Sequence, residues 1–274
     1  MSSEYPFLSI SKINQFFKDN SASPRKKWGQ NFLIDPNTIS YIIQKLNLKP
    51  DSIVAEIGSG LGALTYSIYP LIKNYHVFEI DPVFIKELKN NFSQLIIHEG
   101  DVLKNLSNIS EFNLTLVGNL PYYISTDIIV LALNTLPNMK YAIFMLQREF
   151  AERLCNSISS LALYSICFGE FKYLRTISAN CFFPKPEATS ALIEFIPHTK
   201  NSYSTIQKKK FEIFLRTVFW GKRKTIQKSL LKSPFLEEKE KLNYIQILEN
   251  LNFNLEKRPE ELEKKDYIKI LENL

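Results

Sequence analysis

The segment EIGSGLGALT at residues 56–65 decides how this chain folds. It starts at the end of an apolar run at 53–57 and leads into a pattern with helical spacing at 63–71, so it joins a strand to a helix. Glycines at positions 58, 60 and 62 let the main chain turn sharply and approach a ligand, because no Cβ stands in the way. Such a loop is typical of α/β sheets that bind nucleotides.

The glycine loop alone leaves its ligand open. Read as Gly58-x-Gly60-x-x-Ala63, it fits the fingerprint of dinucleotide sites, with Glu79 about where the ribose-binding acid belongs. A nicotinamide or flavin site and an S-adenosylmethionine site are equally compatible with this loop. A purely structural turn is the third possibility.

Short apolar runs alternate with helical patterns through the first two thirds of the chain. Strands are predicted at 53–57, 76–80, 94–98, 114–117, 141–146, 174–178 and 190–196. Helices are predicted at 36–46, 63–71, 82–91, 126–136, 148–155 and 160–168. Repeated strand–helix–strand units indicate an α/β fold with a parallel sheet, right-handed crossovers and helices on both faces.

The pattern changes after Pro197, beyond which only helices are predicted. They lie at 207–220, 225–231, 238–251 and 259–274. We therefore predict an α/β domain over residues 1–199 and a small all-α domain over residues 200–274.

The composition is that of an ordinary globular protein, with 45% hydrophobic and 23% charged residues among 274. No run approaches the roughly 18 apolar residues that a membrane span needs. The first residues include Glu4 and Asp19 and show no secretory signal pattern. We expect a cytoplasmic protein that makes no membrane contact.

Cysteine and histidine are scarce. The cysteines Cys155, Cys167 and Cys181 are odd in number and far apart, which fits neither a disulfide framework nor a zinc site. The three histidines have no second ligand at metal-binding spacing. We expect reduced thiols and no metal.

Positive charge gathers in two places on a chain of net charge +6. Residues 200–232 hold ten Lys or Arg and one acid, and a second group lies near the N-terminus. A solvated helix face explains either group alone, but two groups favour a polyanion, since Lys and Arg release counterions from phosphates. The candidate contacts are Arg25, Lys26, Lys27, Lys222, Arg223 and Lys224.

Two acidic residues lie at or just after the ends of the next two predicted strands. Glu79 ends one strand, and Asp101 follows Gly100 after another. Both belong at the carboxyl edge of the sheet, where open α/β sheets bind ligands. Glu79 suits the two hydroxyls of a ribose and Asp101 suits an adenine amino group, although either residue also suits the N-cap of a helix.

The segment NLPY at residues 119–122 follows the fourth predicted strand. The proline makes a rigid turn, which holds an amide side chain, a main-chain carbonyl and an aromatic face around one point. Those groups suit a planar base with an exocyclic amine. The alternative is a plain turn with a packed tyrosine.

With these motifs in place, the sequence resembles the KsgA-type ribosomal RNA adenine dimethyltransferases, which are relatives of the erythromycin-resistance methyltransferases. The resemblance spans nearly the whole chain and also rests on GQNFL at 29–33, MLQREFAER at 145–153, FPKP at 183–186 and GKRKT at 221–225. It implies a class I S-adenosylmethionine-dependent methyltransferase sheet of seven strands with a small helical C-terminal domain. It also implies dimethylation, at N6, of two adjacent adenosines in a hairpin loop near the 3′ end of 16S rRNA in the small (30S) subunit.

The resemblance assigns residues to two sites. It implies that the cofactor is bound by Asn31, Leu33, Glu56, Gly58, Gly60, Glu79, Asp101, Val102 and Asn119. It implies catalytic roles for Asn119, Leu120, Pro121, Tyr122 and Phe183, with Phe182 competing with Phe183 to stack on the base. Two departures from the family pattern are Trp28, where Phe is usual, and EATS at 187–190.

Three rival functions remain. The resistance enzymes act on 23S rRNA and share most of these residues, although Glu149 and the long basic C-terminal region are more typical of the housekeeping branch. A ribosome-assembly factor that mainly binds RNA is the second rival. A nicotinamide oxidoreductase is the third, and it leaves residues 119–122 unexplained. We expect a monomer with 16S rRNA as its partner.

Overall fold

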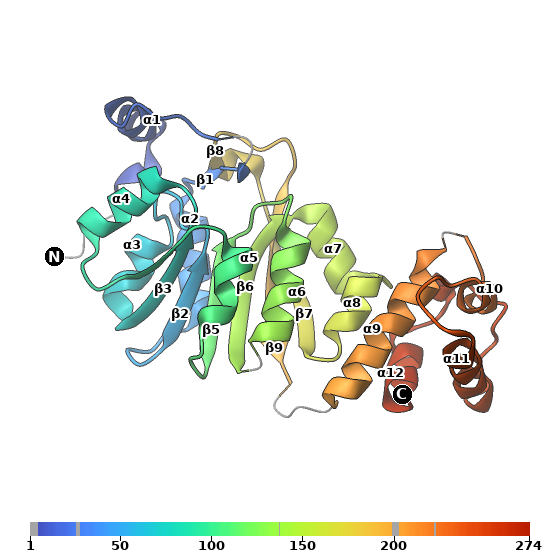
Figure 1. The fold of residues 1–274 in the computed structure, drawn as a ribbon. Coiled ribbons are helices and arrows are strands. Elements are labelled where there is room, and N and C mark those ends of the chain that lie inside the picture. Colours follow the sequence, from blue (N-terminus) through green and yellow to red (C-terminus); the bar gives the residue numbers. More distant parts are fainter. Residues whose placement is uncertain (1–4, 26–27, 137, 199–202, 222) are drawn as a thin grey trace. The chain divides into compact units, whose positions relative to one another are not determined.

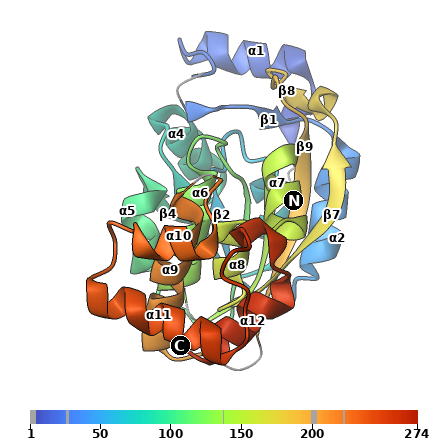
Figure 2. The same ribbon diagram turned by 90° about the vertical axis from the view of Figure 1, so that its right-hand side faces the viewer.

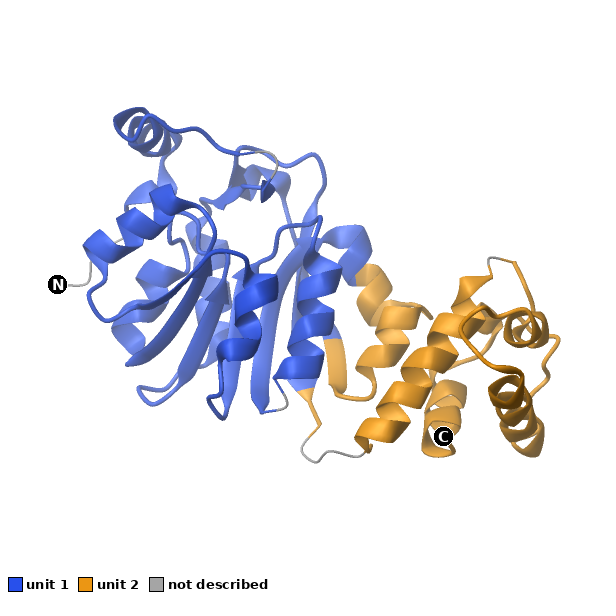
Figure 3. Cartoon of the chain, in the orientation of Figure 1, with its two compact units in different colours: residues 1–151, 172–196 blue, residues 152–171, 197–274 orange. Residues whose placement is uncertain are grey.

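The computed structural model describes residues 5–25, 28–136, 138–198, 203–221 and 223–274 (Figure 1). Two compact units are present. The first comprises residues 1–151 and 172–196, and the second comprises residues 152–171 and 197–274 (Figure 3).

The boundary predicted at residue 199 therefore needs correction, because residues 152–171 belong with the C-terminal helices. Leu163, Ile166 and Cys167 are buried in the same apolar cluster as Phe211 and Phe214. The helix predicted at 160–168 precedes the last predicted strands, which is why the sequence pattern places it in the α/β domain. Packing, and not order along the chain, decides its membership.

The described residues form a seven-stranded sheet, which confirms the predicted fold class. In spatial order its strands are β4 (Ile96–Glu99), β3 (Asn74–Glu79), β2 (Ile53–Ile57), β5 (Leu114–Asn119), β6 (Met139–Gln147), β9 (Ser190–Pro197) and β7 (Gly169–Ile177). The first five are parallel to one another. Figure 2 shows α5 and α6 on one side of the sheet and α2 on the other.

One strand departs from the predicted parallel sheet, because β9 runs antiparallel to β6. Ser190, where β9 begins, pairs with Gln147, where β6 ends. The chain thus enters β9 at the carboxyl edge of the parallel strands and must run back along β6. Alternation of strands and helices in the sequence does not reveal this reversal.

The first unit contains short helices, three of which begin at a capping aspartate. They are α1 (Ile10–Asp19), α2 (Pro36–Leu46), α3 (Thr65–Ile68), α4 (Pro82–Asn91), α5 (Val102–Asn105), α6 (Ser125–Thr135) and the start of α7 (Arg148–Asn156). Asp35, Asp81 and Asp101 each accept a main-chain N–H in the first turn of the helix that follows. These caps fix where α2, α4 and α5 begin. One-turn 3₁₀ helices lie at Pro6–Leu8, Tyr69–Leu71, Leu106–Asn108 and Ala179–Cys181.

Two elements near the N-terminus were not predicted. Helix α1 buries Ile13, Phe16 and Phe17, and the two phenylalanine rings pack against Phe32 and Phe84. Strand β1 (Phe32–Leu33) pairs antiparallel with β8 (Phe182–Phe183). Figure 1 shows the two next to each other. Strands of two residues are too short to produce a periodic signal in the sequence.

The second unit consists of helices around its own apolar core. Its helices are α8 (Ser160–Ser165), α9 (Thr205–Trp220), α10 (Ile226–Leu231), α11 (Glu238–Asn250) and α12 (Lys264–Glu272), with a 3₁₀ turn at Pro259–Glu261. Ser204 and Gln207 form a capping box that starts α9. Among the described helices, none is long and apolar enough to cross a membrane.

Candidate active site

A cavity opens at the carboxyl edge of the parallel strands, within the first unit. Its walls come from β1 and from the residues that follow β2, β3, β4 and β5. All nine predicted cofactor-binding residues line it, namely Asn31, Leu33, Glu56, Gly58, Gly60, Glu79, Asp101, Val102 and Asn119. Carboxyl ends of parallel strands meet at one edge of a sheet, which is why residues so far apart in sequence converge here.

The glycine loop needs its glycines at positions 58 and 60. Both have positive φ angles, +71° and +53° respectively, which side chains other than glycine rarely adopt. A Cβ on Gly60 would also lie 3.2 Å from the ring of Phe32. The loop can therefore hold this path beneath β1 only with glycine.

Glu79 is buried beneath the loop, where main-chain donors hold its carboxylate. Its Oε2 accepts the N–H of Gly60 at 2.7 Å, and its Oε1 accepts the N–H groups of Ile80 and Asp81, each at 2.9 Å. Burial raises the pKa of the Glu79 carboxyl, while these hydrogen bonds oppose the rise. Glu79 thus joins the end of β3 to the glycine loop and faces the cavity.

Glu56 lies at the end of β2 and is also buried. Its Oε2 accepts hydrogen bonds from the hydroxyls of Thr65 and Tyr75. Burial raises the pKa of the Glu56 carboxyl from 4.5 to about 7, and the nearby charge of Glu79 adds to the rise. Burial thus disfavours the carboxylate form of Glu56, and a cationic group bound next to it in the cavity would favour that form again.

Asp101 caps a helix and also lies at the cavity wall. Its Oδ1 accepts the N–H of Leu103 at 2.9 Å and caps α5. The same residue lines the cavity, as do Val102 and Ile80. Capping fixes the carboxylate at the cavity wall, so the structural role and a ligand role are compatible.

The segment that precedes β1 covers the cavity and is pinned to the start of α4. Gln30 donates its side-chain amide N–H to Oδ2 of Asp81 at 2.9 Å, and its Oε1 accepts the N–H of Arg25 at 2.7 Å. The guanidinium of Arg25 lies 3.7 Å from Asp81 and stacks over the ring of Trp28. The motif at 29–33 therefore holds this segment against the start of α4.

Asn119, at the end of β5, contacts this cover directly. Its side-chain nitrogen donates to the main-chain oxygen of Asn31 at 2.9 Å. Since the NH₂ group faces that carbonyl, the side-chain oxygen is left as an acceptor. The following turn is held by hydrogen bonds from the Leu120 N–H to Met145 and from the Ser125 hydroxyl to the Pro121 carbonyl.

The other predicted catalytic residues differ in position. Pro121 lines the cavity, whereas Leu120, Tyr122 and Phe183 are not among the residues that line it. The hydroxyl of Tyr122 lies 2.6 Å from that of Ser190. Phe183 is half-buried opposite Phe32 in the small sheet.

Phe182 and Phe183 point to opposite sides of β8, because side chains alternate along a strand. Phe182 is only 3% exposed and belongs to the apolar core of the first unit. This burial leaves Phe183 as the more accessible of the two rings.

Several residues that line the cavity were not anticipated. They are Tyr5, Trp28, Ile80, Tyr123 and Met145. Ile80 directly follows Glu79, so its place next to the predicted ribose-binding acid was a usable signal. Tyr5 lies in a segment that carries no motif, and nothing in the sequence marked it.

Comparison with known proteins identifies the family to which this chain belongs. A family model described as ribosomal RNA adenine dimethylase matches residues 21–269. Ribosomal RNA small subunit methyltransferase A of Malacoplasma penetrans is 37% identical over 245 residues, which cover 86% of this chain and 86% of that protein. The chain belongs to the ribosomal RNA adenine dimethylase family.

Solved structures agree with this dimethylase assignment. A dimethyladenosine transferase from Plasmodium falciparum matches 87% of this chain and 95% of its own, with a TM-score of 0.75 and 26% identity. The 23S rRNA methyltransferase ErmE matches 89% of this chain and 99% of its own, with a TM-score of 0.66 and 23% identity, and shows the same fold. The chain is an rRNA adenine dimethyltransferase, and the methyltransferase fold implies use of S-adenosylmethionine.

The second unit of the dimethylase carries cations stacked on aromatic rings. Lys224 lies 3.9 Å from the ring centre of Trp220, and Arg216 lies 4.0 Å from that of Phe235. The two rings meet edge to face with their centres 6.3 Å apart. Arg223 is exposed in the same segment, whereas Lys26, Lys27 and Lys222 lie outside the described residues.

The cysteines and histidines take no part in the cavity of the dimethylase. Burial raises the pKa of the Cys155 and Cys167 thiols to about 12, which disfavours the reactive thiolate. His76 and His98 lie with ring nitrogens 2.9 Å apart, between β3 and β4. Across the described residues, no cluster of three or more potential ligands is placed to hold a metal ion.

Proposed function

We propose that this dimethylase transfers methyl groups from S-adenosylmethionine to N6 of two adjacent adenosines in the hairpin loop near the 3′ end of 16S rRNA. Its substrate would be the small (30S) ribosomal subunit, on which the protein acts as a cytoplasmic monomer and contributes to subunit assembly. The observation that carries the proposal is the tie between Asn119 and Asn31, which leaves an amide oxygen fixed beside the glycine loop.

The cavity suits each part of S-adenosylmethionine. The space beside Gly58 is open, because the nearest heavy atom to an added Cβ would be 3.8 Å away. A ligand can therefore approach the main chain of the glycine loop there. Glu79 would receive the ribose hydroxyls, and Glu56 would face the ammonium group. Asp101 would accept from the adenine amino group, with Ile80 and Val102 against the ring. Asn31, Leu33 and Gly60 would close the cavity over the cofactor.

The bound cofactor supplies a sulfonium methyl group, which is a strong electrophile. The adenine N6 is a weak nucleophile because its lone pair is delocalised into the ring. If the Asn119 side-chain oxygen and the Leu120 carbonyl accept the two N6 protons, the nitrogen is drawn toward tetrahedral geometry. The same oxygens then stabilise the positive charge that develops on it. Pro121 keeps both acceptors in place, so the reacting atoms are held in line.

The target base must leave its stack to reach Asn119. Tyr122 would stack on one face of the base, since its hydrogen bond to Ser190 fixes the ring. Phe183 would contact the other face, because Phe182 is committed to the core. Unpaired loop adenosines are the least costly RNA bases to extrude, which is consistent with a hairpin target.

Phosphate contacts would come mainly from the second unit. Arg223 and Lys224 lie on it beside Trp220, which is 42% exposed. Together with Lys222, these residues would neutralise phosphates, while an exposed indole offers a stacking surface. Arg25, another predicted phosphate contact, is held in place by Asp81 and Trp28. Any phosphate contact made by Lys26 and Lys27 would therefore lie next to this fixed residue.

The experiment is methyl transfer from labelled S-adenosylmethionine to small subunits that lack these methyl groups, followed by mapping of the modified bases. We expect two adjacent dimethylated adenosines near the 3′ end of 16S rRNA. Large subunits and naked 16S rRNA serve as parallel substrates. Methylation of 23S rRNA instead would support the resistance-type alternative, and subunit binding without methyl transfer would support a pure assembly role.

A further inference from the structure

The hydroxyl of Tyr5 is buried without a hydrogen-bond partner among the described residues. Its side chain lines the cavity, and the residue is only 8% exposed. Buried hydroxyls are nearly always hydrogen-bonded, because an unpaired one loses its bonds to water without replacement. An orphaned hydroxyl at a ligand cavity therefore points to a partner that the ligand supplies.

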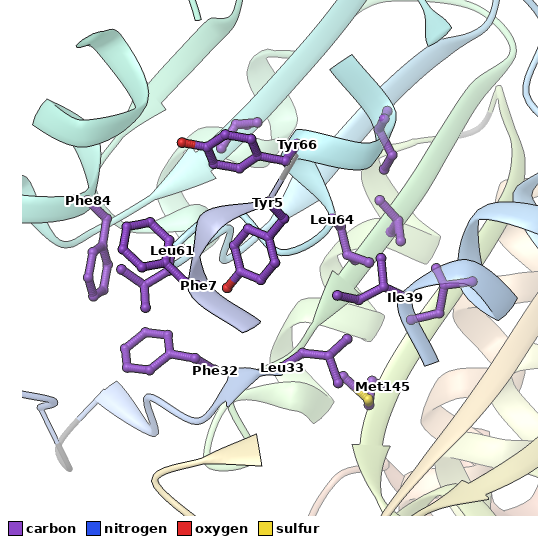
Figure 4. Close-up of a cluster of buried hydrophobic side chains, with 14 of the residues drawn as sticks. Tyr5, Phe7, Phe32, Leu33, Ile39, Leu61, Leu64, Tyr66, Phe84 and Met145 are labelled. Atoms are coloured by element: carbon purple, nitrogen blue, oxygen red, sulfur yellow. The ribbon is translucent and has the colours of Figure 1, made fainter. Parts of the chain in front are cut away.

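The Tyr5 ring is held in place by its neighbours. It packs against Tyr66 with ring centres 5.6 Å apart and against Phe7 at 5.9 Å. In Figure 4 the ring lies between Leu61 and Leu64, with its oxygen on the side of β1, which carries Phe32 and Leu33. This packing directs the hydroxyl before any ligand arrives, so little ordering is required on binding.

Tyr5 belongs to a part of the chain that the family match leaves out. The match begins at residue 21, ahead of which lie Pro6–Leu8 and α1. Helix α1 anchors this segment to the cavity wall through Phe16 and Phe17, which pack against Phe32 and Phe84. The segment thus adds to the cavity a polar group that the family's motifs do not include.

The charge around Tyr5 decides which ligand group it would meet. Burial raises the pKa of the hydroxyl, and the nearby Glu56 carboxyl adds to the rise, so Tyr5 remains a protonated donor. The methionine part of S-adenosylmethionine carries an ammonium and a carboxylate. Glu56 is the acceptor for the ammonium, which leaves the carboxylate to a donor close by.

We propose that Tyr5 donates a hydrogen bond to the carboxylate of the methionine part of S-adenosylmethionine, so that the N-terminal segment is a binding element for the cofactor. This inference rests on the proposed cofactor. It assigns to residues 5–19 a role in holding the ligand, beyond packing against the first unit.

The test is calorimetric binding, without RNA, of S-adenosylmethionine and of its decarboxylated form, which lacks only the carboxylate. The Tyr5→Phe variant removes the hydroxyl and keeps the ring. A hydrogen bond to a charged group corresponds to roughly a 10- to 100-fold change in affinity. We expect Tyr5→Phe to weaken S-adenosylmethionine binding by about that factor and to leave the decarboxylated form within about twofold of the parent.

The matched control is Tyr66→Phe, because Tyr66 belongs to the same ring cluster and is not among the residues that line the cavity. It should bind both ligands like the parent. Thermal unfolding without ligand should show Tyr5→Phe at least as stable as the parent, since the hydroxyl that it removes has no partner there. That result separates weaker binding from impaired folding.

Two outcomes would overturn the assignment of Tyr5. One is unchanged affinity of Tyr5→Phe for S-adenosylmethionine, and the other is an equal loss for both ligands, which would mean that the hydroxyl acts through packing. If the parent binds neither ligand, the proposed cofactor itself is wrong and the inference about Tyr5 falls with it.

Discussion

The side-chain nitrogen of Asn119 donates a hydrogen bond to the main-chain oxygen of Asn31 across 2.9 Å, although 88 residues separate the two in the chain. The contact ties the end of β5 to the segment that covers the cavity. It also orients the Asn119 amide, so that its oxygen remains an acceptor. In the proposed mechanism, closure of the cofactor cavity and preparation of the target amine would therefore depend on one side chain.

Asn119→Ala should abolish most methyl transfer. The variant lacks the acceptor that orients N6, and removal of one such preorganised group typically lowers the rate by about 10²- to 10³-fold. Subunit binding should survive, because Tyr122 and the basic residues are untouched. Single-turnover rates and subunit binding are measured on the same preparation, and a rate within about threefold of the parent would contradict the mechanism.

Asn119→Asp tests the hydrogen bond that the Asn119 side-chain nitrogen donates to the main-chain oxygen of Asn31. The substitution keeps an acceptor but sets a carboxylate oxygen against the Asn31 carbonyl, where an N–H now donates. Repulsion between the two oxygens should loosen the cover, so cofactor affinity should fall in the Asp variant and much less in the Ala variant. Calorimetry with S-adenosylmethionine decides, and tighter binding by the Asp variant than by the Ala variant would refute this account of the hydrogen bond.

The buried Glu56 predicts a pH dependence of stability. Its pKa is raised from 4.5 to about 7 in the folded chain, so the folded chain keeps a proton that the unfolded chain releases between those values. This contribution to stability is fully present below about pH 4.5 and is lost as the pH rises through 7. Relative to Glu56→Gln, the parent should lose on the order of 2 to 3 kcal/mol of unfolding free energy between about pH 5 and pH 8.

Urea unfolding of the ligand-free parent and of Glu56→Gln at several pH values measures that difference. A glutamine offers the hydroxyls of Thr65 and Tyr75 an acceptor and does not titrate, which makes it the appropriate comparison. Parallel stability curves would show that Glu56 has an ordinary pKa in the folded chain.

Phe182 and Phe183 form a matched pair for separating packing from base stacking. Phe182→Ala removes a ring from the core and should destabilise the chain by about 3 to 5 kcal/mol. Phe183→Ala should affect stability less but lower kcat/KM on the subunit by roughly 10- to 100-fold, since stacking on a base contributes about 1 to 3 kcal/mol. Chemical unfolding and methylation kinetics are compared for both, and a fully active Phe183→Ala would exclude the stacking role.

Removal of charge beside Trp220 should weaken subunit binding and its dependence on salt. Replacing Arg223 and Lys224 by Gln should reduce the slope of log affinity against log salt by up to about one unit for each phosphate that is no longer neutralised. The same number of charges is removed in the control, Lys239→Gln with Lys265→Gln, which lie exposed in the same unit. Equal slopes for the two double variants would assign Arg223 and Lys224 to a merely solvated surface.

Much of the site was predictable because its residues lie at strand ends. The glycine loop, Glu79, Asp101 and Asn119 each lie at or just after the end of a predicted strand, and all of them line one cavity. Helices α2 and α4 were predicted with their observed bounds because a proline and an aspartate mark their first turns. The all-parallel sheet was wrong for β9, and the boundary at residue 199 was wrong for residues 152–171.

The sequence by itself determined the α/β fold, the order of the cofactor motifs and the family, because each of these depends on neighbouring residues and on the shared edge of a parallel sheet. Only the tertiary structure decided the pairing of β1 with β8, the burial of Phe182 in place of Phe183, and the position of Tyr5 at the cavity. These features arise where segments distant in sequence pack together. Which side chain is then buried depends on register and close packing, and local residue patterns do not encode either one.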